Sequence, residues 1–107
     1  MKTIALLTVL ALALLSAPAV LAAGEPKRTV EIVDFGFRPA TITVARGTKV
    51  EFENEGAVAH TVSRNGGGFN SGRIAPGKTF SLRFKAAGTF RFHCRIHPDM
   101  RGKIVVQ

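Results

Sequence analysis

Apolar and polar residues alternate along most of the chain beyond residue 28, and the segment KVEFENEG at 49–56 shows this most clearly. There Val50 and Phe52 fall on one side of the backbone, whereas Glu51 and Glu53 fall on the other. A period of two is typical of a β-strand with one buried face. The same alternation, or a short apolar run, predicts further strands within residues 29–35, 40–47, 57–63, 78–88, 89–94 and 102–107.

Turn-forming residues separate these segments, and no helical period occurs after residue 23. Seven or so short strands at this spacing predict an all-β fold, namely a single-domain antiparallel β-sandwich with Greek-key connections. The longest irregular segment is 65–77, which we expect to form a loop or a poorly ordered edge strand. Most turns contain glycine: Arg46–Gly47, Glu55–Gly56, Pro76–Gly77 and Ala87–Gly88.

The first residues have the pattern of a secretory signal peptide. A charged residue, Lys2, precedes an apolar run over residues 4–15, and small residues follow this run. We predict a signal peptide over residues 1–22 with cleavage after Ala22, which leaves residues 23–107 as one mature domain in the periplasm or outside the cell. The alternative is a retained membrane anchor, but a serine and a proline interrupt the apolar run.

Charge and cysteine content narrow the choice of partner and cofactor. The chain contains 15 Lys and Arg residues but only 7 Asp and Glu residues, for a formal net charge of +8. This excess favours an anionic partner, although a merely solvated basic surface is the alternative. No known nucleic-acid-binding motif occurs, and export would place the domain away from nucleic acid, so we expect no nucleic-acid partner. A single cysteine, Cys94, cannot form an internal disulfide, and a bound metal would protect its thiol in an oxidising compartment.

The residues around Cys94 point to a metal loop. His97 and Met100 follow Cys94 at intervals of three residues. Pro98 restricts His97 to an extended backbone, which favours a tight loop over a helix. Such a loop can direct all three side chains toward one point. Thiolate and thioether are soft donors and imidazole is intermediate, a combination that suits copper. Taken alone, Cys94 would be interpreted as a small core residue.

A second imidazole would complete a plane of three strong ligands. His93 precedes Cys94 in a strand, so its side chain faces the opposite side of the sheet and is predicted to lie outside the site. A sandwich can instead bring the strand of His60 beside the loop. Met100 would be a weak axial donor, as in blue-copper sites. The predicted metal ligands are therefore His60, Cys94, His97 and Met100.

These motifs resemble the cupredoxins. The stretch AHTV at 59–62, the stretch GTFRFHCRIHPDMRGKIVV at 88–106, and the opening DFGFRPATITVARGTKVEFENEG at 34–56 are similar to amicyanin- and plastocyanin-like domains. The short Cys-x-x-His-x-x-Met spacing is amicyanin-like. The resemblance implies a cupredoxin-like copper-binding domain over residues 23–107, one type 1 copper ion, and a role in shuttling single electrons rather than catalysis.

Two positions depart from the family pattern. Ile96 stands where the family often has proline, so an N–H is present that could donate to the Cys94 thiolate and raise the reduction potential. Thr61 stands where amicyanin-like sequences tend to carry an asparagine that ties the two ligand segments together. Threonine has a hydroxyl group but a shorter reach, so that link is in question.

The resemblance implies that the ring edge of His97 would be the electron port. The positions of nearby arginines add a second expectation, that they would steer an acidic redox protein of dehydrogenase or cytochrome c type toward a monomeric carrier. These arginines are Arg91, Arg95 and Arg101. The main alternative is a module for copper delivery or storage. Three other functions are less favoured: a catalytic metalloenzyme, a zinc site and a metal-free adhesion domain. An enzyme would need acid–base residues near the metal, and Asp99 is the only carboxylate in the loop.

Overall fold

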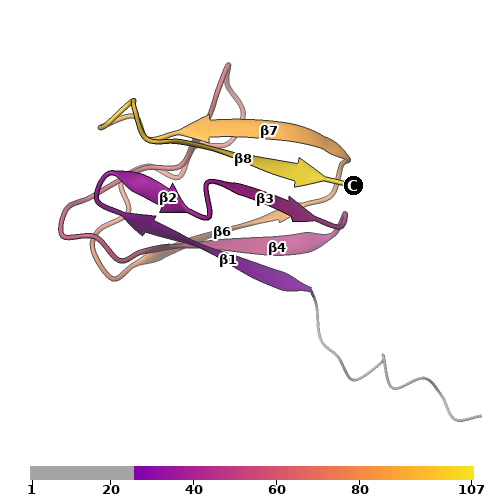
Figure 1. Ribbon diagram of the computed structural model, residues 1–107, viewed down its shortest axis with the longest axis horizontal. Helices are drawn as coiled ribbons and strands as arrows, with labels where there is room; N and C mark the ends of the chain where they lie inside the picture. Colours follow the sequence, from indigo (N-terminus) through magenta and orange to yellow (C-terminus); the bar gives the residue numbers. More distant parts are fainter. Residues whose placement is uncertain (1–25) are drawn as a thin grey trace, which may run out of the picture.

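The computed structural model describes residues 26–107, so the expected signal peptide at 1–22 lies outside the described residues. Strands form two four-stranded sheets packed face to face, and no helix occurs within residues 26–107 (Figure 1). The all-β sandwich is therefore confirmed. The strands are β1 (Lys27–Val33), β2 (Gly36–Arg38), β3 (Thr41–Val44), β4 (Thr48–Asn54), β5 (Ser63–Arg64), β6 (Thr79–Phe84), β7 (Gly88–His93) and β8 (Arg101–Val106).

The expectation of purely antiparallel sheets is wrong. One sheet has the order β2-β1-β4-β6 and the other β3-β8-β7-β5. Strand β1 pairs in parallel with β4, and β3 pairs in parallel with β8; the other pairs are antiparallel. Period-two alternation is the same in both kinds of pairing. Parallel pairs require long connections, and here the chain crosses between the two sheets before β4 and β8 are added.

The alternating apolar residues form the core between the sheets. In β4 every second residue is buried, and Val50 and Phe52 have no exposed surface. The ring of Phe52 meets that of Phe92 from the facing sheet edge-on, with centroids 5.5 Å apart. Burying one such ring contributes about 1.5–3 kcal/mol, so these contacts hold the sheets together in a domain that contains no disulfide.

The segment 57–63 is less regular than the predicted strand. His60 makes only an isolated antiparallel bridge with Ile74, and regular pairing begins at Ser63 in the short strand β5. This segment leaves the sheet of β4 and enters the sheet of β7, so it cannot pair continuously with either. The irregular connection brings His60 to one end of the sandwich, where its side chain is fully buried.

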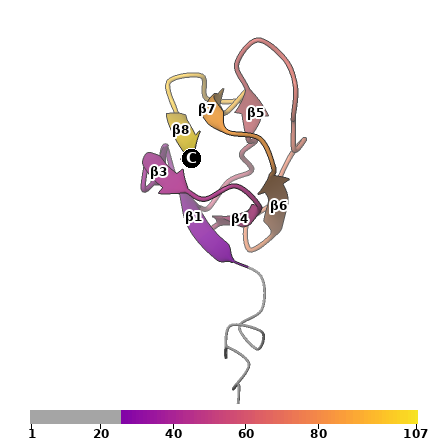
Figure 2. The same cartoon turned by 90° about the vertical axis from the view of Figure 1, so that its right-hand side faces the viewer.

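The β1–β2 turn and the β7–β8 loop lie at this same end (Figure 1). Turning the molecule shows β5 beside β7, with the long connection 65–78 passing over the edge of the sandwich (Figure 2). The far end carries the connection from β6 to β7. The site described below is therefore built from loops at one end of a rigid β-framework.

From residue 26 onward, the structure contains no helix that is long and apolar enough to cross a membrane.

Candidate metal centre

The β7–β8 loop holds three of the predicted ligands in a closed backbone turn. The Cys94 N–H donates to the Met100 carbonyl oxygen at 3.1 Å, and the Met100 N–H donates to the His97 carbonyl oxygen at 2.9 Å. These bonds join the two ends of the loop just beyond the last β7–β8 pair, His93 and Arg101. The loop geometry therefore follows from its own backbone hydrogen bonds and from the strand pairing below it.

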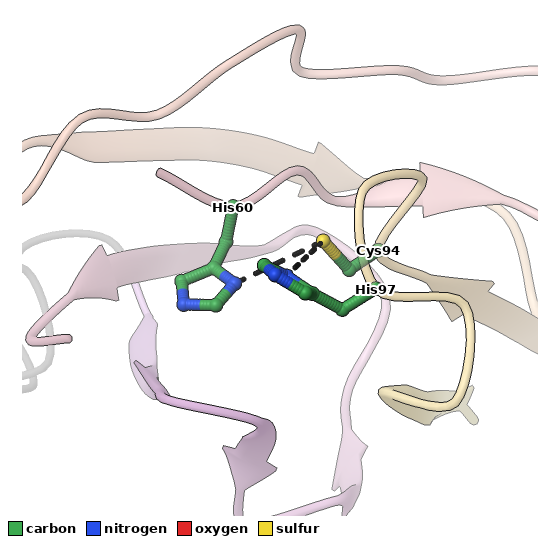
Figure 3. A group of neighbouring side chains, drawn as sticks. All are labelled: His60, Cys94 and His97. Carbon is green, nitrogen blue, oxygen red and sulfur yellow. Dashed lines mark hydrogen bonds between the residues drawn. The ribbon is translucent and has the colours of Figure 1, made fainter. Parts of the chain in front are cut away.

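Two imidazoles and the thiol converge at this end (Figure 3). The ligand atoms of His60, Cys94 and His97 all lie within 4.8 Å of one another. The Cys94 sulfur is 3.9 Å from His60 Nδ1 and 3.9 Å from His97 Nδ1. His60 and Cys94 are fully buried, whereas His97 is only partly buried. The structure thus brings together residues 34 positions apart, with the His97 ring nearest to solvent.

Met100 and His93 are the remaining sulfur and imidazole side chains of this region. Met100 is 2% exposed and belongs to the buried core cluster, and its role as an axial donor stays a prediction. His93 lies outside the cluster, and its Nδ1 is 2.6 Å from the side-chain oxygen of Asn65. His93 is therefore a hydrogen-bonded surface histidine, as alternation along β7 predicts.

Asp34 is a functional residue that sequence reasoning missed. Its Oδ1 is 2.8 Å from His60 Nε2, and its Oδ2 accepts the Ala57 N–H at 2.8 Å. The Ala57 N–H first, and then the hydrogen bond with His60, lower the pKa of the Asp34 carboxyl below its ordinary value. An ionised Asp34 requires the proton of His60 on Nε2, which leaves Nδ1 free to bind a metal. Nothing in the local pattern distinguishes this aspartate from a turn residue.

Phe35, the next residue, contacts the other imidazole. Its φ of 99° lies in the left-handed region, and its side chain is 66% exposed. That backbone conformation costs about 1–3 kcal/mol for a residue other than glycine. The ring meets His97 edge-on, with centroids 5.1 Å apart. The two-residue β1–β2 turn therefore contacts both histidines, one through a carboxylate and the other through an aromatic ring.

Thr61 makes the link between the ligand segments. Its hydroxyl accepts the Arg95 N–H at 2.8 Å, and its own N–H donates to the Cys94 sulfur at 3.3 Å. The hydroxyl is also 3.1 Å from that of Ser63. The shorter side chain spans the gap because the backbone of the His60 segment lies directly beside the loop. Threonine therefore connects the two ligand segments at the position where amicyanin-like sequences tend to use asparagine.

The Cys94 sulfur is surrounded by hydrogen-bond donors. Burial raises the pKa of this thiol, but the hydrogen bonds from the backbone N–H groups of Thr61 and His97, the neighbouring His60 ring, and the Ile96 N–H lower it more, to about 6. The Ile96 contribution is in the predicted direction. Its effect on reduction potential stays a prediction. A thiolate, the form that binds metal, is therefore already favoured near neutral pH.

This lowered pKa predicts a pH-dependent stability of the copper-free protein. The unfolded thiol keeps a pKa near 9.0 and the folded one is about 6, so the unfolded state binds the extra proton between these values. The contribution of Cys94 is fully present above pH 9.0 and is lost as the pH falls through 6. Denaturant titrations across this window should show the loss, and Cys94→Ala should remove this part of the pH dependence. Equal pH dependence in both proteins would contradict the prediction.

The fold and the donor set together define the class. One thiolate, two imidazole Nδ1 atoms and a buried thioether at the loop base provide soft and intermediate donors, and no carboxylate belongs to the cluster within residues 26–107. This chemistry fits copper better than hard-oxygen metals or a four-ligand structural zinc site. A β-sandwich with such a site at one end is a blue-copper protein.

Comparison with known proteins agrees with this class. The sequence matches the cupredoxin-like domain family over residues 4–106, and the chain belongs to that family. Amicyanin-alpha of Methylorubrum extorquens is 32% identical, over 91% of this chain and 93% of that protein. Plastocyanin of Chlamydomonas reinhardtii is 33% identical over 66% of this chain, and the match spans only 58% of that longer protein.

Solved structures show the same relationship. A reduced amicyanin variant is 31% identical with a TM-score of 0.70, over 74% of this chain and 80% of that one. A purple cupredoxin from Nitrosopumilus maritimus, 23% identical with a TM-score of 0.70 over 75% of this chain and 99% of that one, shares the fold. A copper-containing nitrite reductase from Thermus scotoductus matches 77% of this chain, 27% identical with a TM-score of 0.71, but only 22% of the enzyme is covered.

Proposed function

We propose that the protein is an exported carrier of single electrons, with one copper ion held by His60, Cys94, His97 and Met100. The observation that carries this proposal is the convergence of three ligand atoms within 4.8 Å from two separate segments. Copper at such a site supplies a centre that gains and loses one electron. The family relationship to amicyanin and plastocyanin supports a carrier rather than an enzyme.

The protein contributes rigidity and a path for the electron. Asp34 fixes the ring of His60, and the Thr61 N–H together with the closed loop fixes Cys94. These constraints come from the protein's own hydrogen bonds, so both oxidation states would meet the same ligand positions and little reorganisation would accompany transfer. His97 is the ligand nearest to solvent, which supports its ring as the port to a partner.

The remaining parts of the proposal concern processing and location. We propose cleavage after residue 22, a mature domain at 23–107, a location in the periplasm or outside the cell, and a monomeric carrier that meets redox partner proteins. The apolar N-terminal run and the small residues after it support export. Mass spectrometry of the mature protein would identify the first residue, and a chain beginning at Met1 would contradict this part.

Copper delivery is the second candidate, because a partly exposed His97 would also suit transfer of the metal itself. Electron self-exchange and copper transfer distinguish the two. We expect the copper-loaded protein to show a reversible one-electron wave and fast self-exchange, measured by NMR line broadening in mixtures of Cu(I) and Cu(II) protein. Slow self-exchange together with rapid loss of copper to an acceptor apoprotein would favour delivery and overturn the carrier proposal.

A further inference from the structure

The outer face of the β7–β8 pair is basic over the part nearest to the ligand loop, whereas Thr89 and Val105 occupy the opposed positions farther from the loop. Phe92 and Ile104 point into the core, so alternation places their neighbours on the outer surface. On that surface Arg91 lies directly opposite Lys103, and His93 lies directly opposite Arg101. Arg95 continues the series beyond the end of β7. We call Arg91, Arg95, Arg101 and Lys103 the basic face.

Charges of the two signs are distributed unequally between the sheets. Strands β3, β5, β7 and β8 contain no aspartate or glutamate, whereas Glu31, Glu51 and Glu53 lie on β1 and β4 of the other sheet. Within residues 26–107, no residue of the basic face forms an ion pair with a carboxylate. On the other sheet Lys27 does pair with Glu51, at 3.5 Å. The basic face therefore has no counter-charges of its own.

This arrangement does not serve the fold. Two cations directly opposite each other on antiparallel strands repel and destabilise the pair, and Arg91 and Lys103 occupy such positions. Neutral polar residues would fill the same surface positions without that repulsion. A binding role accounts for the charges, because an approaching anionic surface would neutralise them.

The basic face is continuous with the candidate metal loop. Arg95 follows Cys94, and Arg101 follows Met100, so these two residues border the base of the loop. The Arg101 Nε donates to the Pro98 carbonyl oxygen at 3.3 Å, which holds this side chain against the loop that carries His97. A partner on the basic face would therefore lie beside the proposed electron port.

Shallow hollows along this face are lined by cations. One of about 190 Å³ contains Arg91, Arg101 and Lys103, together with Ala40, Thr41 and Gly102. A second of about 380 Å³ lies beside β5 and includes Arg95 and His93. Neither is lined by a carboxylate, whereas a hollow on the opposite sheet contains Glu53 and Glu55. The hollows would accept projecting acidic side chains.

We propose that the basic face is the docking surface for a carboxylate-rich surface of the redox partner protein. This inference deepens the proposed electron-transfer function and rests on it. Carboxylates projecting from the partner would occupy the hollows and pair with the arginines, which would place the partner next to His97. Attraction between the two surfaces would raise the rate of encounter and would weaken as salt screens the charges.

The test uses a polyglutamate peptide as the probe and amide NMR shifts of the mature protein as the readout. The double variant Arg91→Gln/Lys103→Gln removes two charges from the basic face. The matched control Lys49→Gln/Lys85→Gln removes two charges elsewhere, and Lys49 also faces a cation, Arg83, on the neighbouring strand. Both variants keep the metal ligands and have the same net charge.

We expect the peptide to shift the amide NMR signals of β7, β8 and Arg95. The affinity of the protein for the peptide at low ionic strength should fall roughly tenfold or more in the basic-face variant but little in the control. The melting temperature of the basic-face variant should stay unchanged or rise. Equal losses in both variants, or shifts spread over Lys27, Lys49 and Lys85, would overturn the proposal.

A lipid surface and a protein surface can both supply negative charge, so vesicles of anionic phosphatidylglycerol are the second probe. If these vesicles bind through the basic face while polyglutamate does not, the surface is a lipid contact and the proposal is wrong. The peptide measurement uses copper-free protein, so it is independent of the metal. A failed peptide map therefore contradicts docking alone. A colourless copper-loaded protein contradicts the electron-transfer function, and with it the redox role of the partner, even where the peptide still binds the basic face.

Discussion

Replacing Cys94 with serine should abolish the intense visible absorption of the copper-loaded protein. That absorption arises from a bond between thiolate sulfur and Cu(II), and Cys94 supplies the only thiol in the chain. The loss of copper affinity should exceed the roughly 10- to 100-fold loss that follows removal of a ligand's hydrogen-bonding partner. Optical titration with Cu(II), followed by competition with a chelator of known affinity, measures both effects.

His93→Gln is the matched control for this experiment. His93 immediately precedes Cys94, but its ring is hydrogen-bonded to Asn65 on the outer surface of the sheet. The control should keep its colour and its copper affinity. A Cys94→Ser protein that retains the absorption, or a His93→Gln protein that loses it, would show that the ligand assignment is wrong.

The second large effect is expected from Asp34, which lies outside the proposed ligand set. Asp34→Ala removes the acceptor that holds His60 Nε2, so the ring can rotate and can carry its proton on Nδ1. Copper affinity should fall by roughly 10- to 100-fold, the usual consequence of losing such a partner. The reduction potential should rise, because a negative charge that favours Cu(II) is lost. Chelator competition and cyclic voltammetry measure the two changes.

Gly56→Ala tests the same contact without altering any charge. A Cβ at Gly56 would collide with the Asp34 carboxylate and displace it from His60. We expect copper affinity to fall in the same direction as for Asp34→Ala. Asp99→Ala is the charge control, since it removes an exposed carboxylate from the ligand loop. If this control lowers affinity as much as Asp34→Ala does, charge rather than the hydrogen bond is responsible.

Local patterns predicted most of the fold. The alternation around Val50 and Phe52 identified β4, and the segment ending at Cys94 identified β7 with its buried and outer residues. Strand direction could not be predicted, because the side-chain period is two in parallel and antiparallel pairs alike. The segment of His60 was expected to be a strand. Its crossing between sheets, which no local pattern encodes, left it mostly irregular.

The residues of the candidate site were also only partly predictable from the sequence. The sequence predicted Cys94, His97 and Met100 because metal-binding side chains occur there at intervals of three residues. It predicted His60 because the remaining histidine, His93, faces the opposite side of the sheet. Asp34 was missed because its contact spans 26 residues and depends on which turn lies beside which loop. The exposed side chain and strained backbone of Phe35 could not be predicted either, because a phenylalanine that follows an alternating segment is expected to be buried in a regular strand.

The position of the centre has a mechanical consequence for the sandwich. His60 lies on the segment that leaves the sheet of β4, and its carboxylate partner lies in the turn between β1 and β2, whereas the Cys94 loop belongs to the facing sheet. A metal bound between them acts as a cross-link that clamps the two layers at one end only. We therefore expect the two layers of the copper-loaded protein to separate first at the far end, which carries the β6–β7 connection, and unfolding to begin there.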